Sequence, residues 1–421
     1  MRAEPFLERL ARTARGVRLA SVRHGRARYV LTLIGAAIAS LAAGSIASCN
    51  AASVPGPSVE TLAEGRDIFR FDTFGDEKFW TDTLRMHEVI QAAVSPKVAL
   101  SVGLKVDVDA LPAGVKEALA AGTVDLASPA TTLALLKLNA VVGLKGDVRT
   151  VNGKDSLLRV GTTCALCHSN VDDSFAPGIG RRRDGWANTT LNPGAIIALS
   201  PALTAAQRAV YNSWGAGRYD PRYNIDGLNT PIVLPPAYGL RDVASETYTG
   251  EGPVSYWNAY VAVTQMHGQG NFSDPRLGIS IVQQPDLVTP KLPALRAYQF
   301  SLDAPKPPTG SFDVAAAARG RAVFTGAARC ATCHVGSTLS DINSGTVHTA
   351  AETGMDPRYA ARTTRKAYRT TPLRGLFQHA PYFHDGSAAT LSDVVAHYER
   401  TFTLTLSSVQ RRDLIEYLKS L

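Results

Sequence analysis

The sequence is poor in several residue types that often classify a chain at once. Its 421 residues include only five cysteines, too few for a small disulfide-stapled scaffold. The formal net charge is +8, but residues 1–48 carry eight arginines against two glutamates, so only +2 belongs to the remainder. That weak excess argues against a nucleic-acid partner. About 370 residues follow position 48, enough for two or three domains.

Four of the five cysteines fall in two copies of one motif, CALCH at 164–168 and CATCH at 330–334. Two thiols at this spacing with a histidine directly after them are typical of covalent c-type haem attachment. Cysteine pairs also form redox disulfides and zinc sites, but neither requires the histidine in both copies. We therefore expect two covalently bound c-type haems. The attaching residues are Cys164, Cys167, Cys330 and Cys333, and the proximal iron ligands are His168 and His334.

The fifth cysteine, Cys49, follows an arginine-rich stretch and the uncharged, mostly apolar run 29–47. This order is typical of a secretory signal. Residues 46–49, Ile-Ala-Ser-Cys, resemble the bacterial lipoprotein box, in which the signal is cut before the cysteine and the thiol is lipidated. The sequence thus predicts a signal peptide at 1–48 and a periplasmic protein anchored to the membrane through lipid on Cys49. An uncleaved membrane span and a soluble cleaved form are the alternatives, and both also place the chain outside the cytoplasm.

The C-terminal region, 311–421, has the pattern of a small helical haem domain. Asp313 is a candidate N-cap of a helix that leads to the second motif, and Ser407 or Ser408 caps a final amphipathic helix. This plan resembles class I cytochrome c, in which the terminal helices cross at a small residue, here Gly320.

We expect Phe324 to lie beside Tyr417 at this crossing. The pattern recurs near the start of the chain, because residues 65–69 (GRDIF) resemble residues 320–324 (GRAVF). We expect a mainly α fold with two cytochrome c-like haem domains. The first domain, 49–310, would carry long insertions and extended loops. Within it, residues 223–308 are rich in proline, glycine and aromatic residues, which predicts extended chain.

Three further segments carry a family resemblance: TPLRG at 371–375, APYFHDGS at 380–387 and ATL at 389–391. They resemble the C-terminal domain of bacterial di-haem cytochrome c peroxidases and of the related enzymes that mature tryptophan tryptophylquinone. The resemblance is specific over 319–421 and loose in the first half. It implies that hydrogen peroxide, or another small substrate, reacts at the N-terminal haem. Electrons would come from a periplasmic or membrane donor through the C-terminal haem. Calcium between the domains is common in these peroxidases, so the resemblance also allows calcium here.

The distal iron ligands are less clear from the sequence. For the second haem, the peroxidases have a distal methionine at a position where this chain has Tyr398, and the quinone-maturing relatives also have a tyrosine there. Met355 is the alternative distal ligand. For the first haem the candidate is Met266, with His267 as the alternative. The resemblance places His384 near a haem edge and makes it the candidate catalytic residue. Weaker candidates are His397 and His348 as ligands, Glu88, Asp172 and Asp173 as acid/bases, and Trp186 and Trp257 as electron bridges.

Two other functions fit the same motifs. One is a non-catalytic di-haem electron-transfer cytochrome in which both irons have six ligands. The other is a di-haem oxygenase of the rubber-oxygenase kind, acting on a hydrophobic polymer. An open sixth iron position beside an acid/base favours catalysis, whereas two filled positions favour electron transfer.

Overall fold

Short helices dominate residues 56–421, the part of the chain that this computed structural model describes. Residues 1–55 lie outside the described part, and with them lie the expected signal peptide and Cys49. Pro57–Leu421 forms a single compact unit, so the expected boundary between residues 310 and 311 stays a prediction. Within the described residues, every helix is too short or too polar to cross a membrane.

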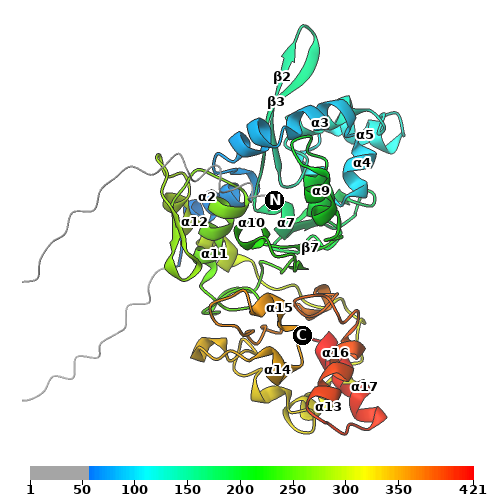
Figure 1. The fold of residues 1–421 in the computed structure, drawn as a ribbon. Helices are drawn as coiled ribbons and strands as arrows, with labels where there is room; N and C mark the ends of the chain where they lie inside the picture. Colours follow the sequence, from blue (N-terminus) through cyan, green and yellow to red (C-terminus); the bar gives the residue numbers. More distant parts are fainter. Residues whose placement is uncertain (1–55) are drawn as a thin grey trace, which may run out of the picture. The chain divides into compact units, whose positions relative to one another are not determined.

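The helices occur along the whole described chain (Figure 1). Before the second motif they are α2 (Val59–Phe71), α3 (Met86–Ala93), α4 (Pro96–Ser101), α5 (Ala113–Ala120), α6 (Pro129–Lys137), α7 (Ala165–His168), α8 (Pro193–Ala198), α9 (Ala205–Asn212), α10 (Tyr223–Asp226), α11 (Val254–Tyr260), α12 (Leu292–Ser301) and α13 (Val314–Thr325). After it they are α14 (Ala350–Thr353), α15 (Pro357–Ala360), α16 (Leu391–Thr401) and α17 (Ser408–Lys419). The expected mainly α class is confirmed for the described residues, whereas the division into two haem domains stays a prediction.

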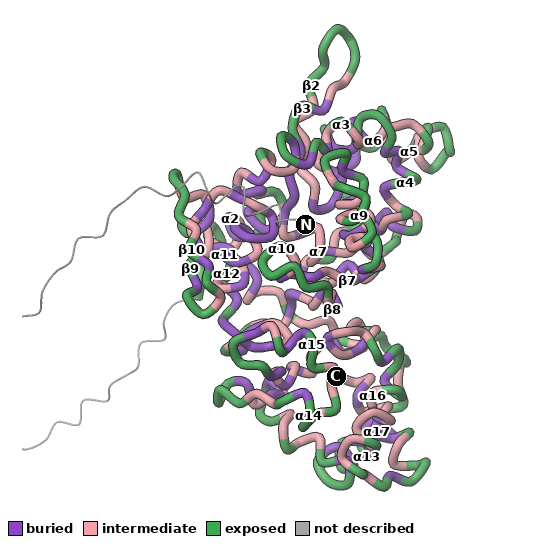
Figure 2. Tube along the Cα trace, in the orientation of Figure 1, coloured by how far each residue is buried: buried purple, intermediate pink, exposed green. Residues whose placement is uncertain are grey.

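The strands of the described part pair only in twos. The pairs are β1 (Val106–Asp107) with β5 (Ile179–Gly180), β2 (Leu144–Val151) with β3 (Lys154–Thr162), β4 (Ser169–Val171) with β6 (Arg182–Asp184), β7 (Arg218–Tyr219) with β8 (Ile232–Val233), and β9 (Phe272–Asp274) with β10 (Ile279–Ile281). The tip of the β2–β3 hairpin projects from the molecule and is exposed (Figure 2), whereas its base packs against α3 and α6. These small pairs serve as connections and do not form a continuous sheet.

The helices α13 and α17 cross at Gly320, as expected from the sequence. A Cβ at Gly320 would lie 1.9 Å from the carbonyl oxygen of Asp413, so only glycine allows this approach. The rings of Phe324 and Tyr417 meet edge to face beside the crossing, with centroids 5.2 Å apart.

The expected caps of these two helices are also present. The carboxylate of Asp313 accepts a hydrogen bond from the backbone N–H of Ala316 at the start of α13. Of the two candidate serines before α17, Ser407 is the N-cap, and it forms a capping box with Gln410.

The helices α2 and α12, which both precede the second motif, repeat this crossing. A Cβ at Gly65 would lie 2.0 Å from the carbonyl oxygen of Ala294, and Phe69 contacts Tyr298 with ring centroids 5.7 Å apart. The five-residue echo in the sequence therefore marks equivalent positions in two helix crossings of the same design.

The expectation of extended chain throughout 223–308 is wrong at α11 and α12. Pro293 lies in the first turn of α12, where its missing N–H costs no helical hydrogen bond. Apolar residues of α12 then pack against α2, and Leu295 is almost fully buried. Tertiary packing thus stabilises a helix in a segment whose composition favours loops.

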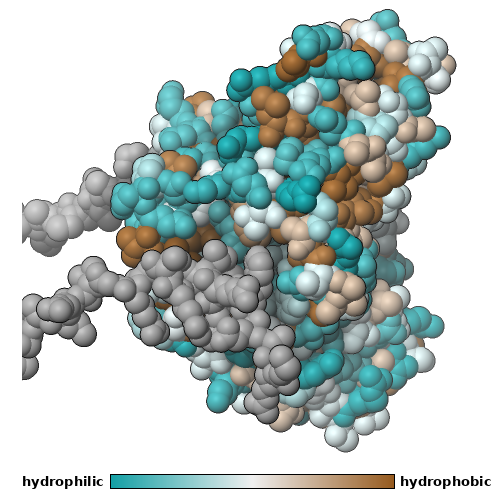
Figure 3. Space-filling view, turned by 45° about the horizontal axis from the view of Figure 1, so that its top comes forward, coloured by the Kyte–Doolittle hydropathy of each residue, from teal (hydrophilic) through white to brown (hydrophobic). Residues whose placement is uncertain are grey.

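Hydrophilic side chains cover most of the face seen in Figure 3, with smaller hydrophobic patches among them. The interior holds several separate core clusters, and two of them lie next to the first CALCH motif.

Candidate functional site

The second motif borders a large cavity. Cys330 begins a short 3₁₀ turn (Cys330–Thr332) directly after α13, and the chain enters this turn through Arg329 with a φ of 56°. Cys330, Cys333 and His334 all line a cavity of about 250 Å³. Its other walls are mainly apolar and come from α16, α17, the 371–384 segment and residues 233–248. A slot of this kind, with two thiols and an imidazole at its wall, fits a covalently attached haem.

The imidazole of His334 is held in one orientation. Its Nδ1 lies 2.9 Å from the carbonyl oxygen of Leu339, and burial lowers its pKa. The ring is therefore neutral, with the proton on Nδ1, and the lone pair of Nε2 is free to bind a metal. Backbone carbonyls that fix a histidine tautomer in this way are typical partners of metal-binding imidazoles.

Both candidate distal ligands of the second haem, Tyr398 and Met355, line this cavity. Burial raises the pKa of Tyr398, so its phenol is protonated in the absence of a metal. The weaker candidates have other partners, because His397 Nε2 lies 2.9 Å from the carbonyl oxygen of Thr353 and both ring nitrogens of His348 contact carboxylates. The choice between Tyr398 and Met355 stays a prediction.

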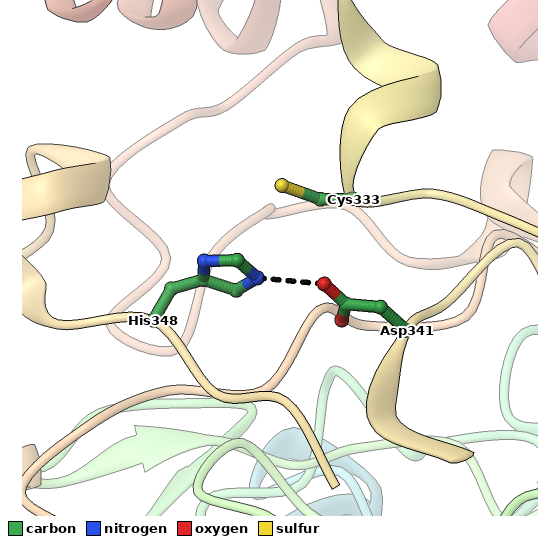
Figure 4. A group of neighbouring side chains, drawn as sticks. All are labelled: Cys333, Asp341 and His348. Atoms are coloured by element: carbon green, nitrogen blue, oxygen red, sulfur yellow. Dashed lines mark hydrogen bonds and ion pairs between the residues drawn. The ribbon is translucent and has the colours of Figure 1, made fainter. Parts of the chain in front are cut away.

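Cys333, Asp341 and His348 offer three donor atoms within 4.8 Å of one another (Figure 4). His348 Nε2 lies 2.8 Å from a carboxylate oxygen of Asp341, and its Nδ1 lies 3.0 Å from Glu352. These two carboxylates raise the pKa of His348 against the effect of its burial. A metal ion at this cluster and a haem on Cys333 would compete for the same thiol.

The first motif holds its histidine in the same way as the second. The short helix α7 carries His168, whose Nδ1 lies 2.9 Å from the carbonyl oxygen of Pro235. Burial lowers the pKa of His168 too, so its Nε2 is likewise free and neutral. The two expected proximal ligands therefore share one arrangement, although their carbonyl partners come from unrelated loops.

The cysteines of the first motif lie between two core clusters. Cys164 packs against the cluster that contains Met266, and Cys167 packs against the cluster that contains Leu136. The described cysteines form no disulfide. Burial raises the pKa of Cys164 and of Cys167 to about 12, and that of Cys330 to about 11. These thiols are thus protonated and lack the thiolate character of a redox-active pair.

The candidate distal ligands of the first haem follow a π-helix, η4 (Val261–Gln265). Met266 is buried in the same cluster that Cys164 contacts. His267 has a φ of 62° and stacks on Phe79, with ring centroids 3.8 Å apart. Burial lowers the pKa of His267 to about 4, so its ring is neutral. Phe79 itself lies on a second π-helix, η2 (Lys78–Thr83), and such turns frequently occur at functional sites.

The three candidate acid/bases, Glu88, Asp172 and Asp173, interact with residues close to them in the chain. Glu88 pairs with Arg85 on an exposed face. Asp172 accepts hydrogen bonds from the backbone N–H groups of Ser174 and Arg181. The Ser174 side chain and these N–H groups lower the pKa of Asp172 to about 2. Asp173 accepts a hydrogen bond from the backbone N–H of Gly178.

A different carboxyl group, Asp76, is buried near the first motif, and no sequence pattern singles it out. It is 0% exposed and accepts hydrogen bonds from the backbone N–H and the hydroxyl of Thr162, two residues before Cys164. Burial raises its pKa to about 8. Its partner is 86 positions away in the chain, so no local pattern could reveal the contact.

His384, the candidate catalytic residue, is buried at the wall of the Cys330 cavity. Its Nε2 lies 2.9 Å from the hydroxyl of Tyr368, and its carbonyl oxygen accepts a hydrogen bond from the N–H of Val233. Of the candidate electron bridges, Trp257 is buried in a core cluster and Trp186 lies under the guanidinium of Arg183.

Comparison with known proteins gives one informative relative. No model of a protein family matches the chain. The methylamine utilization protein MauG of Methylorubrum extorquens is 33% identical over 120 residues, or 25% of this chain. The match covers 34% of MauG, so the chain spans about a third of that relative.

Two solved structures show weaker similarity. Hydrazine synthase of Kuenenia stuttgartiensis has a TM-score of 0.32 at 20% identity, covering 46% of this chain and 73% of that chain. A MauG-like protein associated with microbial copper homeostasis has a TM-score of 0.33 at 18% identity, and the match covers 46% of this chain and 74% of that chain. Scores this low do not establish a shared overall fold. The sequence match to MauG confirms the resemblance to the di-haem cytochrome c peroxidase superfamily.

Proposed function

We propose that the chain is a periplasmic di-haem cytochrome c with peroxidase-like activity. Cys164, Cys167 and His168 would hold the haem at which hydrogen peroxide would be reduced or a small substrate oxidised. Cys330, Cys333 and His334 would hold a second haem, which would supply electrons from a periplasmic or membrane donor. Haem supplies a redox-active iron that reacts with peroxide where its sixth position is open.

The observation that carries this proposal is the repeated arrangement of His168 and His334. Each follows a Cys-x-x-Cys pair, each has Nδ1 at 2.9 Å from a backbone carbonyl, and each keeps Nε2 free. A redox disulfide requires no histidine beside it, and a zinc site formed by the two cysteine pairs requires none in both copies. Two independent loops supply the same geometry, which favours the same ligand chemistry at both places.

The two helix crossings support two cytochrome c-like domains. Gly65 and Gly320 occupy equivalent positions, each beside an edge-on or tilted aromatic pair. On this proposal the first domain ends with α12 and the second begins with α13, close to the boundary expected from the sequence.

Residues of this chain supply the polar groups near the first haem. Asp76 is protonated at neutral pH because burial raises its pKa to about 8, so it can hold a proton close to Cys164. A carboxylic acid kept neutral in this way is suited to general acid chemistry near neutral pH. The neutral ring of His267 on Phe79 is a second group that can accept a proton.

Electron transfer without catalysis is the second candidate. Met266 favours it, because its thioether is buried in the cluster that Cys164 contacts and could bind the first iron as a sixth ligand. An iron with both axial positions filled by protein side chains would leave no position for peroxide.

An electron paramagnetic resonance spectrum of the oxidised and half-reduced haem-loaded protein, paired with a peroxide turnover assay, separates these functions. A high-spin haem together with turnover is the expected result. Two low-spin haems without turnover would contradict the peroxidase proposal and favour the electron carrier.

We further propose that lipid on Cys49 anchors the protein to the membrane. The Cys49→Ala variant is expected to lose its acyl chains in mass spectrometry and to leave the membrane fraction. A variant that stays membrane-bound would favour an uncleaved span.

A further inference from the structure

Two hydrogen-bonded aromatic side chains, Tyr368 and His384, lie together at the wall of the Cys330 cavity. The Tyr368 hydroxyl is 2.9 Å from His384 Nε2, and the two rings stack with centroids 4.3 Å apart. Tyr368 is 6% exposed and His384 5%. Because bulk water has little access, a proton that leaves one of these groups passes most easily to the other.

His384 is the one base among the hydrogen-bond partners of the Tyr368 hydroxyl. The hydroxyl also lies 2.6 Å from the carbonyl oxygen of Asp356 and accepts a hydrogen bond from the N–H of Ala360 at 3.2 Å, so its single proton points either at this carbonyl oxygen or at Nε2 of His384. A backbone carbonyl accepts a hydrogen bond but does not take up a proton near neutral pH. The imidazole does, and burial lowers the pKa of His384 so that its ring is neutral beforehand.

The backbone of His384 connects this pair to the first motif. The N–H of Val233 donates to the carbonyl oxygen of His384 at 2.8 Å. Two residues later, the carbonyl oxygen of Pro235 contacts Nδ1 of His168 at 2.9 Å. Val233 and Pro235 also line the cavity that Cys330 borders. Tyr368 and His384 therefore line the cavity of the second attachment site, and His384 is hydrogen-bonded to the segment that orients the first proximal histidine.

We propose that Tyr368 is a redox-active tyrosine that relays single electrons between the two haem sites, with its phenolic proton held by His384. In the forward step Tyr368 gives one electron to the peroxide-oxidised haem of the first site. Its O–H bond breaks, and the proton forms an N–H bond at Nε2 of His384. In the return step the neutral tyrosyl radical takes one electron from the reduced haem of the second site, and His384 returns the proton.

The relay role rests on the proposed function, whereas the ease of oxidising Tyr368 does not. The first test is therefore photo-oxidation of the haem-loaded protein by a photo-excited ruthenium polypyridyl complex with persulfate. Electron paramagnetic resonance of freeze-quenched samples then detects the radical. The wild type is expected to give a long-lived tyrosyl signal, and the Tyr368→Phe variant is expected to lose it.

Tyr359 provides a matched control. It is also buried, and its ring centroid lies 6.4 Å from that of His384, but its hydroxyl is not hydrogen-bonded to His384. Tyr359→Phe is expected to keep the signal. His384→Gln removes the base. The yield of tyrosyl radical is therefore expected to fall by roughly a hundredfold, the factor that a positioned proton acceptor typically contributes.

Replacement of Tyr368 by 3-fluorotyrosine keeps the ring in place, so it tests the assignment even if Tyr368→Phe misfolds. The hyperfine pattern of the signal is expected to change. An unchanged pattern, an undiminished signal in Tyr368→Phe, or an undiminished yield in His384→Gln would overturn the proposal.

A second experiment adds hydrogen peroxide to the same proteins. The tyrosyl signal is expected in the wild type, and slower peroxide turnover is expected in Tyr368→Phe with unchanged haem spectra. Equal turnover in Tyr368→Phe and wild type would overturn the relay role. Absence of turnover in the wild type would instead count against the proposed function, and the photo-oxidation result would still stand.

Discussion

Burial controls the protonation of the residues that matter most in this molecule. It keeps His168 and His334 neutral, and it keeps Asp76 protonated with a pKa of about 8. Desolvation disfavours the charged form of each group, which lowers the pKa of a histidine and raises that of a carboxyl. The candidate site therefore places uncharged ligands and one uncharged acid beside the expected haems.

Asp76 gives a prediction about stability. Its pKa is about 8 in the folded chain and near 3.8 when unfolded, so the folded state holds the extra proton between these values. The contribution of Asp76 to the free energy of unfolding is fully present below pH ~4 and is lost as the pH rises through ~8. Asp76→Asn is expected to remove this part of the pH dependence, as measured by urea unfolding at several pH values. Parallel pH profiles for variant and wild type would contradict the buried protonated carboxyl.

Tyr398 and Met355 give opposite predictions for the second haem. If Tyr398 is the distal ligand, Tyr398→Phe changes the low-spin spectrum and raises the reduction potential, because axial ligands set haem potentials over a range of about 0.8 V. Met355→Leu then leaves both unchanged. Potentiometric titration monitored by absorption spectroscopy measures the spectrum and the reduction potential together. A change in Met355→Leu with none in Tyr398→Phe would assign the ligand to Met355.

At the scale of elements, the two glycine crossings determine how closely the helices approach. Gly320 lets α13 lie against α17, and Gly65 lets α2 lie against α12. Each crossing places an aromatic pair, Phe324 with Tyr417 or Phe69 with Tyr298, next to it.

Gly320→Ala is expected to lower the free energy of unfolding by about 1–3 kcal/mol, because the new methyl group overlaps the Asp413 carbonyl in a packed interface. Gly114→Ala in α5 is the control, since a Cβ there meets no atom within 4 Å. That change is expected to be neutral or to stabilise by up to ~1 kcal/mol. Denaturant unfolding measures both, and equal effects would contradict the close crossing.

At the scale of the whole described chain, buried ion pairs join segments that are far apart in the sequence. Arg362 follows α15 and pairs with Asp220 at 2.8 Å and with Asp226, which belongs to the first half. The side chains of Arg362 and Asp220 are 3% and 0% exposed. Arg222 and Glu251 form a second buried pair beside them, and Glu251 also accepts a hydrogen bond from the N–H of Thr364.

Arg362→Met is expected to cost about 3–5 kcal/mol, because it leaves the Asp220 carboxylate buried without its cation. Arg358 is a matched control four residues earlier, with a 74% exposed side chain that pairs with Asp356. Arg358→Met is expected to cost at most ~1 kcal/mol. Thermal or urea unfolding of the two variants measures the difference, and a small effect of Arg362→Met would mean that water reaches Asp220.

The sequence by itself determined the two attachment motifs, their histidines, the cap at Asp313 and a serine cap at 407 or 408. Each of these depends on residues close together in the chain, where spacing and side-chain chemistry leave few alternatives. The crossing at Gly320 was expected from the resemblance to class I cytochrome c, because its partner Asp413 is far away in the chain. The echo at 65–69 also pointed to the second crossing. It could not indicate α12 as the partner helix, because proline near its start resembles a loop signal.

Only the tertiary structure decided which distant residues meet. The contacts of Asp76 with Thr162, Tyr368 with His384, and Pro235 with His168 join positions separated by 86, 16 and 67 residues. No local periodicity encodes such contacts, because they depend on how helices and loops pack after the backbone is folded. The shifted pKa values follow from the same packing, since burial is a property of the folded chain and not of the residue type.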